Sequence, residues 1–234
     1  LGPLGTFSHE AVVRQFGEEV KLLPQATVEE ALQAVERDDA NYALVPIENS
    51  TEGVVNKTIE ACINTLLSIC AELVLPIHHH LLSRENDINK ISQIYSHPQA
   101  LAQCQKWLEK TLPHAALLPA KSTSQSCMLA AREANTATVA GEIALEHHKL
   151  NVIAKNIEDE VNNATRFYVL GKQNTKPTGQ DKTSMLVWLP HEPGALVMLL
   201  NAFSKNGINL TLIESRPSKQ QSWEYYFFLE MEGH

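Results

Sequence analysis

Residues 157–170 read IEDEVNNATRFYVL, and this stretch decides how the first part of the chain is organised. Its second half is an apolar run with the length and composition of a buried strand. Two separate series of short strands and helices precede it, and we expect this strand to return the chain to the first series. One series inserted into another produces two lobes joined by a double crossing. The sequence therefore predicts a hinged, two-lobed α/β domain with a cleft.

The first series opens with helices whose ends are marked in the sequence. Ser8 offers an N-cap for the first helix, and Gly17 supplies its stop. Thr27 and Glu30 form a capping box that opens the second helix. Further on we expect a buried strand at 42–47, a helix at 54–67 and an extended stretch at 73–82.

The second series repeats this alternation of strands and helices. Pro98 suits the first turn of one helix, and Ser122 or Thr123 begins another. Strands are expected at 94–96, 115–118 and 138–140, and a further helix at 142–148. Because strands alternate with helices, we expect most of the strands to be parallel.

A third region follows residue 171. Its first dozen residues are rich in Lys, Gln, Asn, Thr, Pro and Gly with almost no apolar content, which is typical of a linker. After the linker we expect strands at 184–189, 210–214 and 223–231 and a helix at 194–205.

Composition limits the function classes. The chain has 234 residues, 44% of them hydrophobic and 20% charged, as in soluble globular proteins. A formal net charge of −8 argues against nucleic-acid binding, which relies on clustered Lys and Arg. No signal peptide is visible, and the longest apolar run, at 66–77, is too short to span a membrane. The four cysteines show no C-x-x-C spacing, so we expect reduced thiols in a cytoplasmic protein.

Five segments carry a resemblance to a known family. Residues 2–8 (GPLGTFS), 45–53 (VPIENSTEG) and 163–167 (NATRF) resemble the signature set of prephenate dehydratases, which convert prephenate into phenylpyruvate. Residues 194–196 (GAL) and 214–217 (ESRP) resemble the phenylalanine-sensing ACT domain of the same family. The resemblance spans nearly the whole chain. It implies a dehydratase domain similar to bilobal periplasmic binding proteins, followed by a ferredoxin-like ACT domain.

The resemblance also implies domain boundaries. We expect a dehydratase domain at 1–172, with lobe one at 1–76 and 158–172 and lobe two at 77–157, then a linker at 173–182 and the ACT domain at 183–234. The family's ACT domain continues with a second helix and a closing strand, so we expect the βαββ pattern here to be incomplete. The chain starts without Met, which is typical of a piece of a longer protein.

The chemistry of the family sets what the site must do. Prephenate carries two carboxylates and a ring hydroxyl, and it becomes aromatic as it loses CO2 and water. The site must fix the pose, help hydroxide leave as water, and leave the ring carboxylate poorly solvated. None of these tasks needs a metal or a redox cofactor, so we predict neither.

Thr165 matches the catalytic threonine of the family, and we interpret its hydroxyl as a hydrogen-bond donor to the departing oxygen. Glu48 or a water is the ultimate source of the proton. Arg166 offers a bidentate fork for a substrate carboxylate. Side chains alternate along a strand, however, so Thr165 and Arg166 should face opposite sides, and an ion pair at the surface is the alternative.

The other substrate-binding candidates lie where strands end and helices begin. Residues 6–8 are expected at a strand-to-helix turn, where free N–H groups can hold a carboxylate, although Ser8 alone is a plain N-cap. Residues 49–51 follow a buried strand, a place that turn chemistry explains nearly as well. The predicted set is Thr6, Phe7, Ser8, Asn49, Ser50, Thr51, Thr123, Arg166 and Phe167, with Phe167 serving as cleft wall or core. His97 is a second-tier candidate for the cleft edge.

The run His78-His79-His80 suggests a metal site, and we reject it. No Cys or carboxylate at ligand spacing completes the set, and the expected reaction needs no metal.

In the third region the resemblance implies a phenylalanine site between paired ACT domains, and hence a homodimer or homotetramer. Its expected residues are Gly194, Ala195, Leu196, Asn209, Glu214, Ser215, Arg216 and Pro217. Gly194 would allow close approach of the backbone to the ligand, and the charged pair Glu214 and Arg216 would meet a zwitterion.

The sequence thus predicts a prephenate dehydratase regulated by phenylalanine, with no nucleic-acid or membrane partner. Arogenate dehydratase, which carries out the same chemistry on a substrate with an amino group, remains open, as does a chorismate mutase segment ahead of Leu1. A non-catalytic ligand-binding protein of the same bilobal fold is disfavoured by the Thr165-Arg166-Phe167 motif.

Overall fold

The computed structural model describes residues 1–217 and 225–234. The chain divides into two compact units, Leu1–Lys172 and Gln173–His234. The first unit contains two sheets and therefore two lobes, as the sequence predicts.

Lobe one is built on a four-stranded sheet with the order β2-β1-β9-β3. Its strands are β1 (Tyr42–Asn49), β2 (Gly53–Val54), β3 (Ser68–Pro76) and β9 (Ala164–Gly171). The returning strand β9 lies between β1 and β3 and pairs antiparallel with both. The prediction of mostly parallel strands is wrong for this lobe, because β9 enters the sheet against the direction of its two neighbours.

Three helices complete lobe one: α1 (Phe7–Phe16), α2 (Val28–Glu36) and α3 (Asn56–Ile63). The N-cap of α1 is Thr6 rather than Ser8, because the helix begins two residues earlier than expected and no strand precedes it within residues 1–6. The capping box of Thr27 and Glu30 opens α2 as predicted. Helix α3 ends early at Ile63, where the side chain of Asn64 donates to the carbonyl of Glu60.

Helix α1 covers one face of the lobe-one sheet, and α2 and α3 pack against each other and against β1. The core under α1 consists of Ala11, Leu44, Leu75, Ile77, Phe167 and Val169. Phe167 is therefore a core residue, which is one of the two roles expected for it.

Lobe two has a five-stranded sheet with the order β6-β5-β7-β4-β8. The strands are β4 (His80–Ser83), β5 (Gln93–Ser96), β6 (Ala116–Pro119), β7 (Thr136–Ala140) and β8 (Asn151–Ala154). Strand β5 is parallel to β6 and β7, whereas β4 is antiparallel to β7 and β8. The prediction of parallel strands thus holds for β5, β6 and β7, which are connected through helices, and not for β4 and β8.

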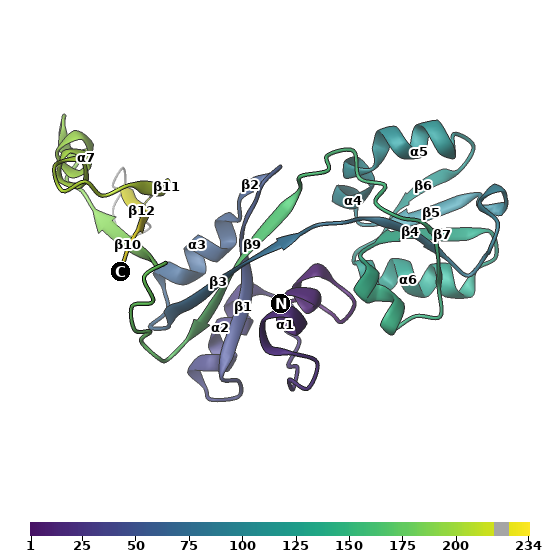
Figure 1. Cartoon of the computed structure of the whole chain (residues 1–234), viewed down its shortest axis with the longest axis horizontal. Coiled ribbons are helices and arrows are strands. Elements are labelled where there is room, and N and C mark those ends of the chain that lie inside the picture. Colours follow the sequence, from purple (N-terminus) through teal and green to yellow (C-terminus); the bar gives the residue numbers. More distant parts are fainter. Residues whose placement is uncertain (218–224) are drawn as a thin grey trace. The chain divides into compact units, whose positions relative to one another are not determined.

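The helices of lobe two lie on both faces of its sheet: α4 (Pro98–Gln103) and α5 (Gln105–Thr111) on one, and α6 (Thr123–Arg132) on the other (Figure 1). The short 3-10 helices are η1 (Ile88–Lys90) and η2 (Glu142–Glu146), the second replacing the α-helix expected at 142–148. Two apolar clusters fill the lobe, one around Ile94 and Leu108 and one around Cys127 and Ala144.

The two lobes are joined by a double crossing. Figure 1 shows β3 and β9 side by side in lobe one, with the chain leaving β3 for lobe two and coming back into β9. The crossings are held together, since Ile77 N–H donates to the carbonyl of Asn163 and Ile157 N–H donates to that of His79. Paired crossings of this kind position side chains from both lobes around the same point.

The second unit has the strand-helix-strand-strand order expected of the ACT domain. It contains β10 (Lys182–Trp188), α7 (Ala195–Lys205), β11 (Leu210–Pro217) and β12 (Tyr225–Glu232), with sheet order β10-β12-β11. Both pairings with β12 are antiparallel. Residue 223, where we expected the last strand to begin, lies outside the described residues.

None of the helices in residues 1–217 and 225–234 combines the length and the apolar character needed to cross a membrane.

Gly141 marks a close contact between the lobes. A Cβ on this residue would lie 2.7 Å from Cε1 of Phe7, the first residue of α1, although the φ of −71° suits any residue. We predict that Gly141→Ala lowers the free energy of unfolding by about 1–3 kcal/mol, the usual cost of overpacking. Chemical denaturation measures this. The double variant Phe7→Leu/Gly141→Ala should lose less than the sum of the two single variants, and full additivity would contradict the contact.

Candidate active site

Strand β9 sorts the side chains of the motif at 163–167 onto two faces. Thr165 pairs in register with Asn49 of β1, and Arg166 pairs with Glu48. Phe167, on the same face as Thr165, packs into the core under α1. Thr165 therefore lies on the face that α1 covers, and Arg166 lies on the other.

The hydroxyl of Thr165 is held by the amide of Asn49. Asn49 Nδ2 donates to Thr165 Oγ1 at 2.9 Å and to Asn163 Oδ1 at 2.8 Å. Its own Oδ1 accepts from the backbone N–H groups of Thr51 (3.0 Å) and Glu52 (3.1 Å), which fixes the orientation of the amide. Because Thr165 Oγ1 accepts from Asn49, its proton remains available for a second partner.

The same network reaches lobe two. Asn163 Nδ2 donates to Gln103 Oε1 at 3.3 Å, and Nε2 of His79 lies 2.7 Å from the same oxygen. Gln103 Nε2 donates to the Glu52 carboxylate at 3.2 Å. We call the five side chains Thr165, Asn49, Asn163, Gln103 and His79 the amide chain. Asn49, Asn163 and His79 are buried in it, at 8%, 3% and 2% exposure.

Sequence reasoning named Asn49 and Thr165 as site candidates, but it did not single out Gln103 and gave no role to Asn163. Gln103 ends α4, the short helix that begins at Pro98, and the one local signal is a polar residue directly before the buried Cys104. His79 was considered only as a metal ligand. Their partners lie 24 or more positions away in the sequence, so local patterns could not reveal them.

The three consecutive histidines have three different partners. His78 Nδ1 lies 2.8 Å from Oε1 of Glu158, whose Oε2 accepts the His79 backbone N–H. His79 belongs to the amide chain, and Asn156 N–H donates to His80 Nδ1 at 3.1 Å. All three thus bind the first crossing to the second or to α4, and they do not converge on one point. Across the described residues no group of three or more His, Cys, Asp or Glu is arranged to hold a metal ion.

The start of α1 lies beside the amide chain. The ring of Phe7 meets the His79 imidazole edge to face, with 5.3 Å between centroids. Thr6 caps the helix and donates its hydroxyl proton to the Pro3 carbonyl at 2.9 Å. Ser50 and Thr51 follow β1, and both hydroxyls lie within 3.5 Å of Asn163 Oδ1.

Arg166 and Glu48 are engaged with each other on the opposite face. The guanidinium, 11% exposed, contacts Glu48 Oε2 at 3.0 Å and Glu72 Oε2 at 2.8 Å, and it lies over the Tyr168 ring. This geometry favours the ion-pair alternative over a fork that shares an anion with Thr165. Glu48 is paired with Arg166 on the face opposite Thr165, and its expected role as proton source stays a prediction.

Thr123 and His97 lie in helix starts of lobe two. Ser122 is the N-cap of α6 and accepts from Gln125 N–H, and Thr123 is the first residue of that helix. His97 is the N-cap of α4 through its Nδ1. In the described part of the chain no hydrogen bond joins either residue to the amide chain.

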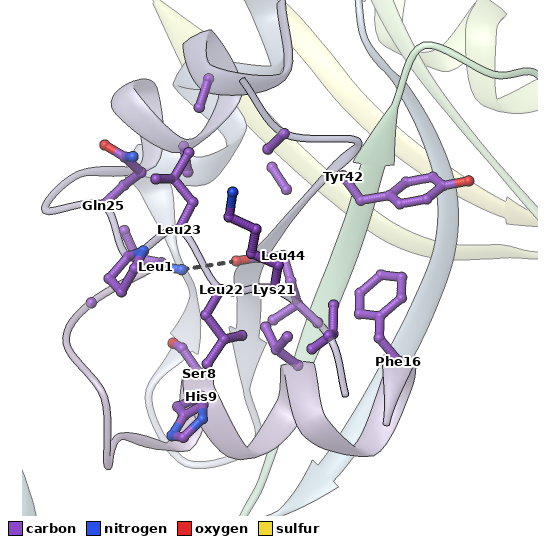
Figure 2. Close-up of a pocket in the computed structure, with 18 of the residues that line it drawn as sticks. Leu1, Ser8, His9, Phe16, Lys21, Leu22, Leu23, Gln25, Tyr42 and Leu44 are labelled. Carbon is purple, nitrogen blue, oxygen red and sulfur yellow. Dashed lines mark hydrogen bonds between the residues drawn. The ribbon is translucent and has the colours of Figure 1, made fainter. Parts of the chain in front are cut away.

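A separate cavity of about 260 Å³ lies in lobe one between α1, residues 20–25 and β1 (Figure 2). The nitrogen of Leu1 donates to the Leu44 carbonyl at 3.4 Å beside this cavity. Figure 2 marks this contact with a dashed line. Ser8 and His9 line the cavity, whereas none of the amide-chain residues does, so Ser8 lies toward this cavity and makes no part of the chain.

The expected phenylalanine-site residues occupy two places in the second unit. Gly194 is the N-cap of α7 with φ of 89°, a left-handed conformation that favours glycine, and Ala195 and Leu196 begin that helix. Asn209 directly precedes β11, whose last four residues are Glu214, Ser215, Arg216 and Pro217. Glu214 and Arg216 share one face of β11 and form an ion pair at 3.3 Å.

Residues 1–175 match the family model described as prephenate dehydratase. The chain belongs to the prephenate dehydratase family. Residues 183–234 match the ACT domain model, as the second resemblance in the sequence implied.

The curated relatives and solved structures agree with this assignment. The chain is 45% identical over 234 residues to a bifunctional chorismate mutase/prephenate dehydratase from Aquifex aeolicus, spanning 100% of this chain and 65% of that relative. It is 36% identical to a prephenate dehydratase from Bacillus subtilis over 99% of this chain and 87% of the relative. A prephenate dehydratase from Arthrobacter aurescens, solved with L-Phe, superposes with a TM-score of 0.91 at 36% identity, covering 100% of this chain and 79% of that one. The predicted α/β fold of this family is thereby confirmed.

The buried histidines predict how stability depends on pH. Burial lowers the pKa of His79 and His80 below the ordinary 6.5, so the unfolded chain binds protons that the folded chain does not. The free energy of unfolding should therefore fall as pH drops from 7 to 5. Burial alone would raise the pKa of Glu158, but hydrogen bonds from His78 and backbone N–H groups lower it, which adds a further loss below about pH 4.5.

Urea denaturation at a series of pH values measures this dependence. His79→Gln removes one titrating group, so its slope between pH 7 and 5 should be shallower by at most about 1.4 kcal/mol per pH unit. An unchanged slope in the variant would show that His79 titrates alike in both states.

Proposed function

We propose that this chain converts prephenate into phenylpyruvate. One proton is consumed as the ring carboxylate leaves as CO2 and the ring hydroxyl leaves as water. The electron pair of the broken carbon–carbon bond enters the ring, which becomes aromatic. The enzyme therefore has to supply hydrogen-bond donation to the leaving oxygen and a fixed pose.

The observation that carries this proposal is the state of the Thr165 hydroxyl. Asn49 donates to its oxygen, so the threonine proton is left to point toward a ligand. A threonine hydroxyl is too weak an acid to give up its proton at neutral pH, but it can donate a hydrogen bond to the oxygen that accumulates charge as it departs. The membership of the chain in the prephenate dehydratase family supports the same role.

We propose that solvent, rather than Glu48, is the source of the proton that is consumed. Glu48, the other candidate, is paired with Arg166 on the opposite face of the sheet. Thr165 donates a hydrogen bond to the oxygen as it departs, and the one proton that turns the leaving hydroxide into water comes, in net terms, from the buffered solvent.

The second unit adds a regulatory proposal. We infer that phenylalanine binds there, at the start of α7 and the end of β11, and lowers turnover. The ACT match and the L-Phe complex of the Arthrobacter aurescens enzyme support this. A site shared between paired ACT domains would make the protein a homodimer or homotetramer. We also propose a cytoplasmic location, which is the expectation drawn from the cysteine spacing in the sequence.

The first test offers the purified chain prephenate and arogenate separately and identifies the product of each. We expect phenylpyruvate from prephenate, with kcat falling about 10² to 10³-fold in Thr165→Ala and KM staying within a few-fold. Thr165→Ser should keep much of the rate, because it retains the hydroxyl.

Other outcomes of that assay would change either the substrate or the role assigned to Thr165. Turnover of arogenate alone would replace prephenate as the substrate, and no turnover of either would favour a ligand-binding protein. Equal loss in the Ser and Ala variants would show that the methyl group of Thr165 matters rather than its hydroxyl.

Phenylalanine should bind an associated form of the chain and reduce prephenate turnover. If the site is shared between subunits, ligand binding and association stabilise one another by linkage, with a coupling of about 1–3 kcal/mol. Calorimetry and sedimentation at matched protein concentrations measure both. Full-affinity binding to a strict monomer would contradict the shared site.

A further inference from the structure

The amide chain has a single direction of hydrogen bonding, which is set independently at its two ends. At the Thr165 end, two backbone N–H groups occupy Oδ1 of Asn49, so its Nδ2 must face Thr165 and Asn163. Asn163 consequently presents its Oδ1 to Asn49 and its Nδ2 to Gln103.

At the other end, a carboxylate sets the direction. Glu52 can only accept, so the group of Gln103 that faces it, at 3.2 Å, is Nε2. Oε1 of Gln103 then faces both Asn163 and the imidazole of His79. An oxygen cannot donate, so His79 must carry its proton on Nε2.

His79 is buried at the crossing between the lobes, so its Nε2 proton acts on Gln103 rather than on solvent. The residue is 2% exposed and lies on the first crossing between the lobes, where Glu158 holds its backbone N–H and Phe7 packs on its ring. Its Nδ1 is buried without a hydrogen-bond partner in the described structure. The ring thus makes one polar side-chain contact, and that contact is to Gln103.

We propose that His79 is a positioning residue for Thr165: its Nε2–H, together with Glu52, holds the Gln103 amide in place, and Gln103 in turn positions Asn163, the side chain that accepts from Asn49 beside Thr165. The proposal rests on the proposed dehydratase function. Burial keeps the imidazole neutral near pH 7, because it lowers the pKa of His79. Lobe two thereby contributes to the orientation of a hydroxyl on lobe one.

Three substitutions of His79 distinguish the contribution of Nε2 from that of Nδ1. The amide of His79→Gln can place an N–H near the position of Nε2, that of His79→Asn reaches only the position of Nδ1, and His79→Leu offers neither. We expect His79→Gln to keep kcat within about threefold. His79→Asn and His79→Leu should lose about 10 to 100-fold in kcat with KM within a few-fold, the scale on which misplaced catalytic groups act.

His80→Gln is the matched control, since it changes the neighbouring buried imidazole outside the amide chain. It should keep kcat within about twofold. The double variant His79→Leu/Gln103→Leu should be no slower than Gln103→Leu alone if His79 acts through Gln103. Circular dichroism and unfolding midpoints restrict the comparison to variants that are folded under assay conditions.

A second readout does not depend on turnover. Two-bond ¹H–¹⁵N spectra of the histidine rings in the full chain should show the Nε2–H tautomer for His79, and the Gln103→Leu variant should lose this preference. An Nδ1–H tautomer in the native chain overturns the proposal. So does a folded His79→Leu with native kcat, or a His79→Asn that outperforms His79→Gln.

The two proposals fail differently. A native chain that turns over neither prephenate nor arogenate overturns the dehydratase function, and with it the catalytic role of His79. A native chain that is active while the His79 variants are unaffected overturns only the positioning role.

Discussion

The antiparallel insertion of β9 between β1 and β3 is the constraint on which the rest of the first unit depends. It closes the double crossing, and it brings residues 49 and 165 into direct register although 116 positions separate them. Alternation along β9 then assigns Thr165 to the face under α1 and Arg166 to the ion pairs on the other face. A slip of one residue would exchange these two roles.

Much of this fold could be predicted from local signals, because these act over a few residues. The capping box of Thr27, the proline that begins α4 and the return of the chain into lobe one are all visible in the sequence. Strand direction was not predictable in the same way. A strand that comes back from another lobe has no nearby helix to fix its sense, and the pattern of alternating elements then suggests parallel pairing by default.

The residues of the candidate site likewise fall into those that local sequence reveals and those that only the fold brings together. Thr165 and Asn49 belong to short motifs and could be named from them, whereas Gln103 and His79 enter the amide chain only through partners that the fold supplies. Glu48 and Arg166 show the converse: their chemistry suits catalysis, but Arg166 pairs with Glu48 across the strand pair and with Glu72 as well. A charged side chain in a motif therefore needs its facing residue before it can be assigned to a substrate.

The one-way order of the amide chain also has a consequence for the chemical lifetime of the protein. Spontaneous loss of ammonia from asparagine or glutamine, the ordinary ageing reaction of side-chain amides, exchanges an NH2 group for oxygen at almost constant shape. At Asn49 or Asn163 that exchange would turn a buried donor into an acceptor facing another acceptor. An old molecule could thus keep its fold and lose the alignment of Thr165, so that protein content and activity would drift apart in storage.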